Sequence, residues 1–165
     1  MDIRPAGPED AERISEIRRQ DGVREGVLAL TSERLKETED FLASLKADDR
    51  ALAAVENSET VGLAVLIRST IPRREHSATL AIMVDTARQG MGIGSALMSA
   101  ILREADEVLK LQRIELLVLT DNKAAMALYR KNGFEVEAVR RHAAVRNGRF
   151  VDEFFMGRLR GEASI

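Results

Sequence analysis

Three glycines that alternate with apolar residues are the feature of this sequence with the clearest chemical meaning. They form the run Gln89-Gly90-Met91-Gly92-Ile93-Gly94, which follows an apolar stretch from Leu80 to Val84 that is typical of a buried strand. Each glycine in a helical turn costs about 1 kcal/mol relative to alanine, so three of them indicate backbone that approaches a ligand closely. A helix that begins here presents unpaired N–H groups and a partial positive charge, which suit a phosphate group.

The spacing of the glycines excludes two common phosphate-binding motifs. The dinucleotide fingerprint G-x-G-x-x-G/A fails because its third position falls on Ser95 when counted from Gly90, and on Leu97 when counted from Gly92. A P-loop requires a lysine after the last glycine, and the segment 93–97 contains none. The run instead resembles the Q/R-x-x-G-x-G/A pyrophosphate loop of the GNAT superfamily, the acyl-CoA-dependent N-acyltransferases. A tightly packed helix start without a ligand is the alternative interpretation.

A second segment carries the same resemblance. The stretch NKAAMALYRKNGF, residues 122–134, is similar to the second GNAT block N-x-x-A-x-x-x-Y-x-x-x-G-F, with Asn122, Ala125 and Tyr129 at the family spacing. Two such blocks in this order are hard to obtain by chance, so the chain is identified as a member of the superfamily. Without the resemblance, Tyr129 would be read as an ordinary amphipathic residue with a buried ring and a solvated hydroxyl.

The expected elements follow the order of the GNAT fold over nearly the whole chain. We expect strands at residues 3–5, 51–56, 61–67, 80–84, 113–120, 134–145 and 150–159, and helices over 8–20, from a cap at Thr31, after the glycine run, and over 123–131. The fold class is α/β (α+β), with a central mixed, twisted sheet of about seven strands and flanking helices. By resemblance, the central parallel strands splay apart. We treat residues 1–165 as one domain.

The last two strands are predicted to form a hairpin. Asn147-Gly148 between two apolar, β-branched stretches is a strong signal for a type I′ turn. A two-residue loop at this position would place His142 opposite Glu153, and Ala143 opposite Asp152.

Composition excludes several classes of function. The 25 basic and 27 acidic residues are nearly balanced, which gives no electrostatic footprint for nucleic acid or for an anionic membrane. The chain has no cysteine and only two histidines, His76 and His142, so we expect no metal site. The N-terminal segment lacks the apolar run of a signal peptide or a membrane span, and we expect a cytoplasmic protein.

The resemblance implies acetyl-CoA as the co-substrate. Its pantetheine arm would lie between the splayed strands and pair with strand backbone, and its pyrophosphate would bind the amides of the glycine run. One strand N–H would also polarise the thioester carbonyl. The cofactor-binding residues implied in this way are Ile82, Met83, Val84, Gln89, Gly90, Met91, Gly92, Ile93, Gly94, Ser95, Asn122, Ala125 and Tyr129.

Tyr129 is the residue that we expect to protonate the departing thiolate. A phenol with a pKa near 10 gives its proton to a thiolate with a pKa near 8.5 at a cost of about 2 kcal/mol, which is small beside a whole barrier. His76, before the central strand, and Glu115, on the neighbouring strand, are the candidates for the base that deprotonates the amine. A salt bridge for Glu115 and a loop hydrogen bond for His76 are the structural alternatives.

The acceptor is expected to be an amino acid or another small amine. The segment from Arg146 to Asp152 loosely resembles branches that acetylate free amino acids or amino-acid-like herbicides, and branches that modify ribosomal-protein N-termini. Arg24 could bind an acceptor carboxylate. A protein N-terminal acetyltransferase and a non-catalytic acyl-CoA-binding sensor stay open as alternatives. Homodimers are common among such relatives, so a homodimer is compatible with the resemblance.

Overall fold

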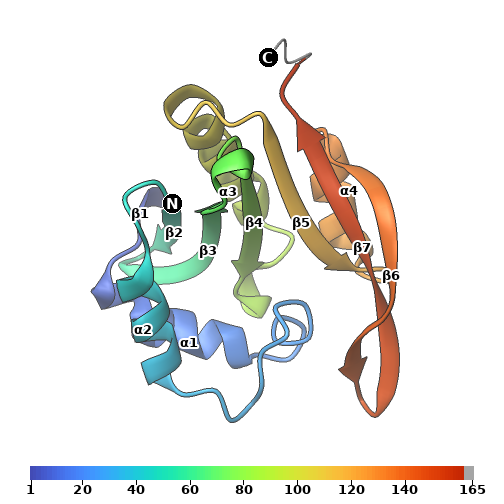
Figure 1. The fold of residues 1–165 in the computed structure, drawn as a ribbon. Coiled ribbons are helices and arrows are strands. Elements are labelled where there is room, and N and C mark those ends of the chain that lie inside the picture. Colours follow the sequence, from blue (N-terminus) through green and yellow to red (C-terminus); the bar gives the residue numbers. More distant parts are fainter. Residues whose placement is uncertain (162–165) are drawn as a thin grey trace.

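A mixed sheet forms the centre of the molecule in the computed structural model, which describes residues 1–161 (Figure 1). Within these residues the sheet has seven strands in the order β1-β2-β3-β4-β5-β7-β6. Neighbouring strands are antiparallel except β4 and β5, which are parallel. The predicted fold class is therefore confirmed. The strands are β1 (Asp2–Pro5), β2 (Arg50–Glu56), β3 (Glu59–Arg68), β4 (Ser77–Val84), β5 (Arg113–Leu119), β6 (Glu135–Arg146) and β7 (Arg149–Leu159).

Helices cover both faces of the sheet. Helices α1 (Ala11–Arg19) and α2 (Leu35–Ser44) lie over one face, and α3 (Ile93–Arg103) and α4 (Lys123–Lys131) lie over the other (Figure 1). Strand β3 is buried on both sides: Leu63 and Val65 pack with residues of α1, whereas Ala64 and Leu66 pack with residues of α3. Burial on both faces explains why this strand is a continuous apolar run in the sequence.

The two parallel strands separate soon after they begin. Strands β4 and β5 pair only from Ser77 with Arg113 to Thr79 with Glu115, although β4 continues to Val84 and β5 to Leu119 (Figure 1). Past Thr79, the edge of β4 that faces β5 has no partner strand among the described residues. Because buried backbone N–H and C=O groups require partners, this gap is a natural place for an extended ligand with amide groups.

Two expected details are wrong. Helix α2 begins at Leu35 rather than beside Thr31, since the carboxylate of Glu37 accepts a hydrogen bond of 2.6 Å from the N–H of Arg34 and caps the helix there. The turn at Asn147-Gly148 forms as expected, with both residues at positive φ, but His142 does not lie opposite Glu153.

A bulge in β6 causes the change of register. Residues 141–143 of β6 face Asp152 alone, and His142 adopts φ 51° while its N–H donates to the Asp152 carboxylate at 2.8 Å. The pairing resumes with Arg140 opposite Glu153. The bulge thus moves Glu153 beside Arg140 instead of His142.

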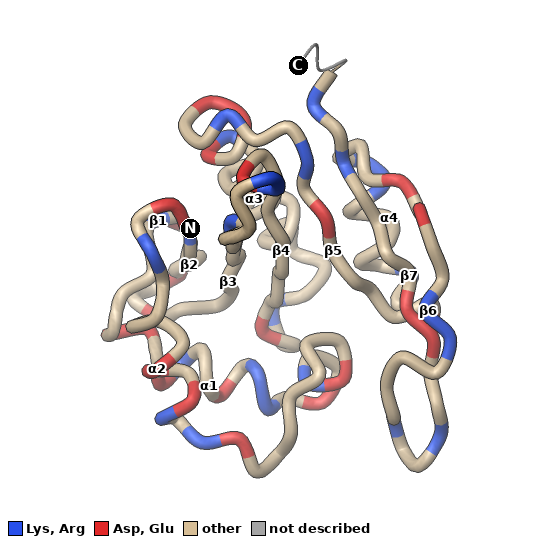
Figure 2. Tube along the Cα trace, viewed as in Figure 1, with Lys and Arg blue, Asp and Glu red and all other residues tan. Residues whose placement is uncertain are grey.

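Charged residues of both signs are mixed over the outer elements, while the middle of β3 and β4 carries neither sign (Figure 2). None of the helices described here is both long and apolar enough to span a membrane.

Candidate active site

The glycine run forms a tight turn between β4 and α3. Gly90 and Gly92 have φ of +78° and +86°, a left-handed conformation that other residues rarely adopt, and Gly92 is the N-cap of α3. The first intrahelical hydrogen bond of α3 is donated by Ala96 to the carbonyl of Gly92 at 3.0 Å. The N–H groups of residues 93–95 are therefore available to an anion, at the positive end of the helix dipole.

A buried carboxylate holds the start of this turn. Asp85 is 4% exposed and accepts hydrogen bonds from the N–H of Ala87 at 2.9 Å and from the guanidinium of Arg13 on α1. Helix α1 is in this way tied to the segment that leads into the glycines, which fixes the turn relative to the sheet.

A cavity of about 250 Å³ lies in the gap between β4 and β5 and reaches the glycine turn. We call it the gap cavity. Most of the residues predicted to bind acetyl-CoA line it, namely Ile82, Met83, Val84, Gln89, Gly90, Gly94, Asn122, Ala125 and Tyr129. Four others, Met91, Gly92, Ile93 and Ser95, do not line it. They belong to the turn and the first helical residues, where the backbone N–H groups are the expected ligands.

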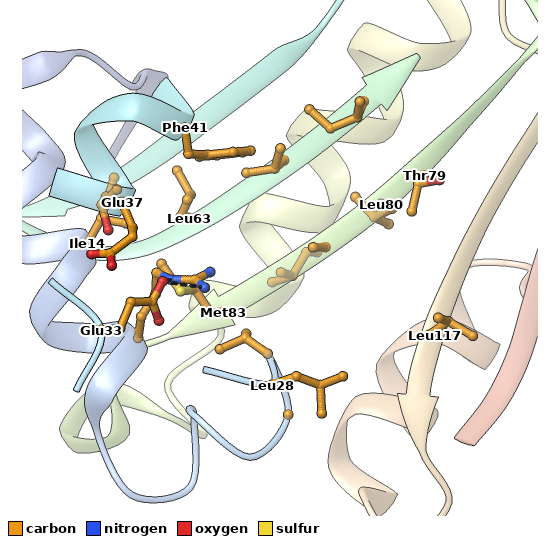
Figure 3. A pocket seen from close by; sticks show the side chains of 18 of the residues that line it. Ile14, Leu28, Glu33, Glu37, Phe41, Leu63, Thr79, Leu80, Met83 and Leu117 are labelled. Atoms are coloured by element: carbon orange, nitrogen blue, oxygen red, sulfur yellow. Dashed lines mark hydrogen bonds and ion pairs between the residues drawn. The ribbon is translucent and has the colours of Figure 1, made fainter. Parts of the chain in front are cut away.

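A second cavity, of about 450 Å³, lies between the sheet, α1, α2 and the loop that joins these helices. We call it the α1–α2 cavity. Figure 3 shows Glu33 and Glu37 at its helical end, and Leu117 on β5 across the gap from β4. Its wall is mostly apolar. The polar side chains that line it are those of Arg18, Glu33, Glu37, Thr38, Thr79, Tyr129 and Glu153.

The two cavities adjoin, and Tyr129 lines both of them. Its ring is 7% exposed and packs edge-to-face on Phe134, with centroids 5.9 Å apart. The hydroxyl forms no hydrogen bond with any of the described residues. Burial raises the pKa of Tyr129 to about 12, since a phenolate would lose its hydration there.

The two predicted base candidates lie outside both cavities. His76 is exposed before β4, and its backbone carbonyl accepts hydrogen bonds from the N–H groups of Gln112 and Arg113. Glu115 accepts a hydrogen bond of 2.9 Å from Nε of Arg113. Arg24 is ion-paired with acidic neighbours in its own loop and also lines neither cavity.

Glu33, Thr38 and Glu153 are cavity residues that the sequence analysis missed. Glu33 lies in the loop before α2, and Thr38 lies in α2, which begins at Leu35 and not beside Thr31 as expected. The bulge places Arg140, and not His142, opposite Glu153. Two acidic residues, Asp152 and Glu153, within the otherwise apolar stretch 150–156 were the available signal for Glu153.

Comparison with known proteins agrees with this geometry. The profile of the acetyltransferase (GNAT) family matches residues 13–134. The L-amino acid N-acetyltransferase AaaT of Escherichia coli (strain K12) is 33% identical over 158 residues, which cover 96% of this chain and 97% of that protein.

Two solved structures share the fold. One is yncA from Salmonella typhimurium, solved with its cofactor acetyl-CoA (TM-score 0.90, 22% identity, 100% of this chain and 96% of that one). The other is ribosomal-protein-alanine N-acetyltransferase from Brucella melitensis, with a TM-score of 0.87 and 24% identity, and the match covers 96% of this chain and 99% of that one.

The fold, the open strand edge and the glycine turn define an enzyme of the acetyl-CoA-dependent acyltransferase class. The chain belongs to the GNAT family and is an N-acetyltransferase.

Proposed function

We propose that the protein transfers the acetyl group of acetyl-CoA to the primary amine of an amino acid or another small amine, by direct attack of the amine on the thioester. The observation that carries this proposal is the position of Tyr129 in the walls of both cavities. An acceptor in the α1–α2 cavity and a thioester in the gap cavity would meet beside this side chain. The E. coli relative, an L-amino acid N-acetyltransferase by name, supports the class of acceptor.

The gap cavity suits the co-substrate. Successive residues of β4 turn their backbone groups to opposite sides, and the N–H of Asp85 donates to Val61 of β3. The backbone groups of Ile82 and the N–H of Val84 therefore face the edge without a partner strand and are available to the pantetheine amides, whereas the backbone groups of Met83 face β3. A Cβ on Gly94 would be 3.5 Å from Leu128, so the small residue keeps this wall of the cavity open. The N–H groups at the start of α3 would hold the pyrophosphate.

Tyr129 is the general acid in this proposal. With a pKa of about 12, the phenol is protonated at neutral pH. The proton would move to a thiolate with a free pKa near 8.5, a gap of about 3.5 units or about 5 kcal/mol. The same burial also disfavours the thiolate, which narrows this gap in the complex. His76 and Glu115 stay sequence predictions for the base, and neither lines either cavity.

The α1–α2 cavity limits the size of the acceptor. Its volume of about 450 Å³ falls within the range of small-molecule sites. Its apolar wall, with Leu63 and Phe41 on facing elements, suits a short side chain (Figure 3).

Release of thiol from acetyl-CoA tests the proposed function. The chain has no cysteine, so a chromogenic thiol reagent reads coenzyme A alone. The panel comprises the L-amino acids, their amides, dipeptides and polyamines. We expect turnover with at least one free amino acid or small amine, confirmed by mass spectrometry of the N-acetylated product. Tight binding of acetyl-CoA without thiol release across the panel would identify a sensor, and turnover of dipeptides alone would favour a protein N-terminus as acceptor.

A further inference from the structure

Three carboxylates line the α1–α2 cavity, and two of them accept short hydrogen bonds from other groups of the protein. Oε1 of Glu33 accepts a hydrogen bond of 2.9 Å from Nε of Arg18 and lies 2.8 Å from Nη2 of the same guanidinium, whereas Oε2 is buried without a hydrogen-bond partner among the described residues. Glu37 is exposed and accepts the 2.6 Å hydrogen bond that caps α2. The third carboxylate, that of Glu153, has a different environment.

Glu153 is a buried acid with little compensation. The residue is 4% exposed, and its one hydrogen bond to the described residues is a long one of 3.3 Å, donated by Arg140 to Oε2. The side chain of Arg140 is itself 53% exposed, so its charge is largely screened by solvent. A buried carboxylate is costly unless it is paired and hydrogen-bonded. A cationic ligand in the cavity would recover part of this cost.

The position of Glu153 is suited to a reacting amine. Glu153 lies opposite Leu119 of β5, on the same face as Leu117, and Leu117 lines both cavities. Glu153 and Tyr129 both line the α1–α2 cavity, so a carboxylate and a phenol face the same space.

We propose that Glu153 binds the ammonium form of the acceptor and removes a proton from it before attack. This inference rests on the proposed function. It names a base on β7, at a position that the pairing of β7 with β5 determines.

Glu153 and Tyr129 together account for every proton that moves in the reaction. The Glu153 carboxylate takes one proton from the ammonium, and the nitrogen lone pair then forms the C–N bond to the thioester carbon. The C–S bond breaks with its electron pair on sulfur, and the sulfur takes the Tyr129 proton. The second nitrogen proton returns to the tyrosinate, and Glu153 releases its proton to water. The products are the amide, the free thiol and one proton.

A general base increases the reaction rate most when the acceptor amine has a high pKa. At pH 7 an α-amine with a pKa near 8 is about one-tenth neutral, whereas an amine near 10.4 is neutral about once in 2,500 molecules. The charged or titratable groups that share the cavity or contact Glu153 are Arg140, Arg18, Glu33, Glu37 and the phenol of Tyr129. Of these, the phenol stays neutral near pH 7 and Glu33 is neutralised by Arg18.

The test compares Glu153→Gln with wild type and with Glu104→Gln. Glu104 is a half-buried carboxylate that is paired with one arginine, Arg50, at 3.1 Å and lines neither active-site cavity. For E153Q we expect kcat/KM at pH 7 to fall about 10²- to 10⁴-fold, and the loss to shrink as the pH approaches the pKa of the amine. The acetyl-CoA dissociation constant should not change, and E104Q should match wild type.

Two results would overturn the role of Glu153. One is an E153Q enzyme within threefold of wild type, and the other is a loss that does not depend on pH. If E153Q loses acetyl-CoA binding, Glu153→Asp decides: this variant keeps the carboxylate but withdraws it, and should lose at least about tenfold in kcat/KM while keeping the wild-type pH profile. Absence of turnover by the wild type with every acceptor would instead refute the proposed function itself.

Discussion

Gln20 and Thr86 join the end of helix α1 to the turn that leads into the glycines. Oε1 of Gln20, at the end of α1, accepts a hydrogen bond of 2.9 Å from the N–H of Thr86, which lies in the turn that leads to the glycines. The Thr86 hydroxyl donates in return to the carbonyl of Asp21 at 3.0 Å. The loop that lines the α1–α2 cavity is therefore attached to the segment that leads into the glycine turn.

Removal of this link should weaken acetyl-CoA binding. Gln20→Ala deletes the bond to Thr86 and a second one to Asp85 at 3.3 Å, each of which contributes about 1 kcal/mol. We expect the dissociation constant to rise about five- to thirtyfold, measured by calorimetry. Gln112→Ala is the matched control, since the Gln112 side chain bonds only to the nearby Lys110 carbonyl. Equal affinity of the two variants would show that the link has no part in binding.

The ionisation of Tyr129 can be measured directly. The chain has one tyrosine and no tryptophan, so phenolate absorbance near 295 nm reports on this residue alone. We expect a midpoint at about 12 in the folded protein, and near 10 in denaturant. A folded midpoint near 10 would mean that the hydroxyl is solvated.

The same shift predicts how alkali affects stability. The pKa of Tyr129 is higher in the folded than in the unfolded protein, so the protonated phenol contributes to the free energy of unfolding. This contribution is fully present below pH 10 and is lost as the pH rises to about 12. The loss amounts to about 3 kcal/mol of unfolding free energy. Denaturant melts of wild type and Tyr129→Phe between pH 9 and 12 should diverge by this amount. Parallel curves would contradict the shift.

Tyr129→Phe should also separate chemistry from binding. The phenylalanine keeps the ring and its edge-to-face contact with Phe134, and removes only the acidic proton. We expect kcat to fall about 10²- to 10⁴-fold with little change in acetyl-CoA affinity, as measured by steady-state kinetics and calorimetry. An unchanged kcat would exclude Tyr129 as the general acid.

Local chemistry explains which parts of the site could be predicted from the sequence. The turn was predictable because positive φ at Gly90 and Gly92 is a glycine property. The start of α4 was predictable because the side chain of Asn122 caps it, accepting from the N–H of Ala125 at 3.1 Å. Both signals depend on neighbours in the chain.

Contacts between segments that are distant in the sequence explain why Glu153 and Thr38 were not predicted as cavity residues. The position of Glu153 at the cavity follows from the pairing of β7 with β5, which places it opposite Leu119, and this pairing joins segments that are far apart in the sequence. Thr38 reaches the cavity because α2 begins at Leu35 and packs beside α1, which a capping signal at Thr31 did not foretell.

The glycines of the turn offer a test of ligand binding that is separate from backbone strain. Gly90→Ala forces a side chain into φ +78°, which costs about 1–2 kcal/mol of stability. Gly148→Ala, in the distant hairpin turn at φ +71°, carries the same strain and also has open space around its Cβ. The two variants should therefore lose similar stability in denaturant melts.

Their affinities for acetyl-CoA should differ. Gly90 lines the gap cavity at the turn whose N–H groups we expect to hold the pyrophosphate, so a shift of its backbone disturbs those donors directly. We expect G90A to bind acetyl-CoA at least about tenfold more weakly than wild type, a loss of about 1.4 kcal/mol. G148A should bind as wild type does, because it lies in the β6–β7 turn and lines neither cavity. If G90A binds as tightly as G148A, the alternating glycines serve the packing of the turn and the pyrophosphate lies elsewhere.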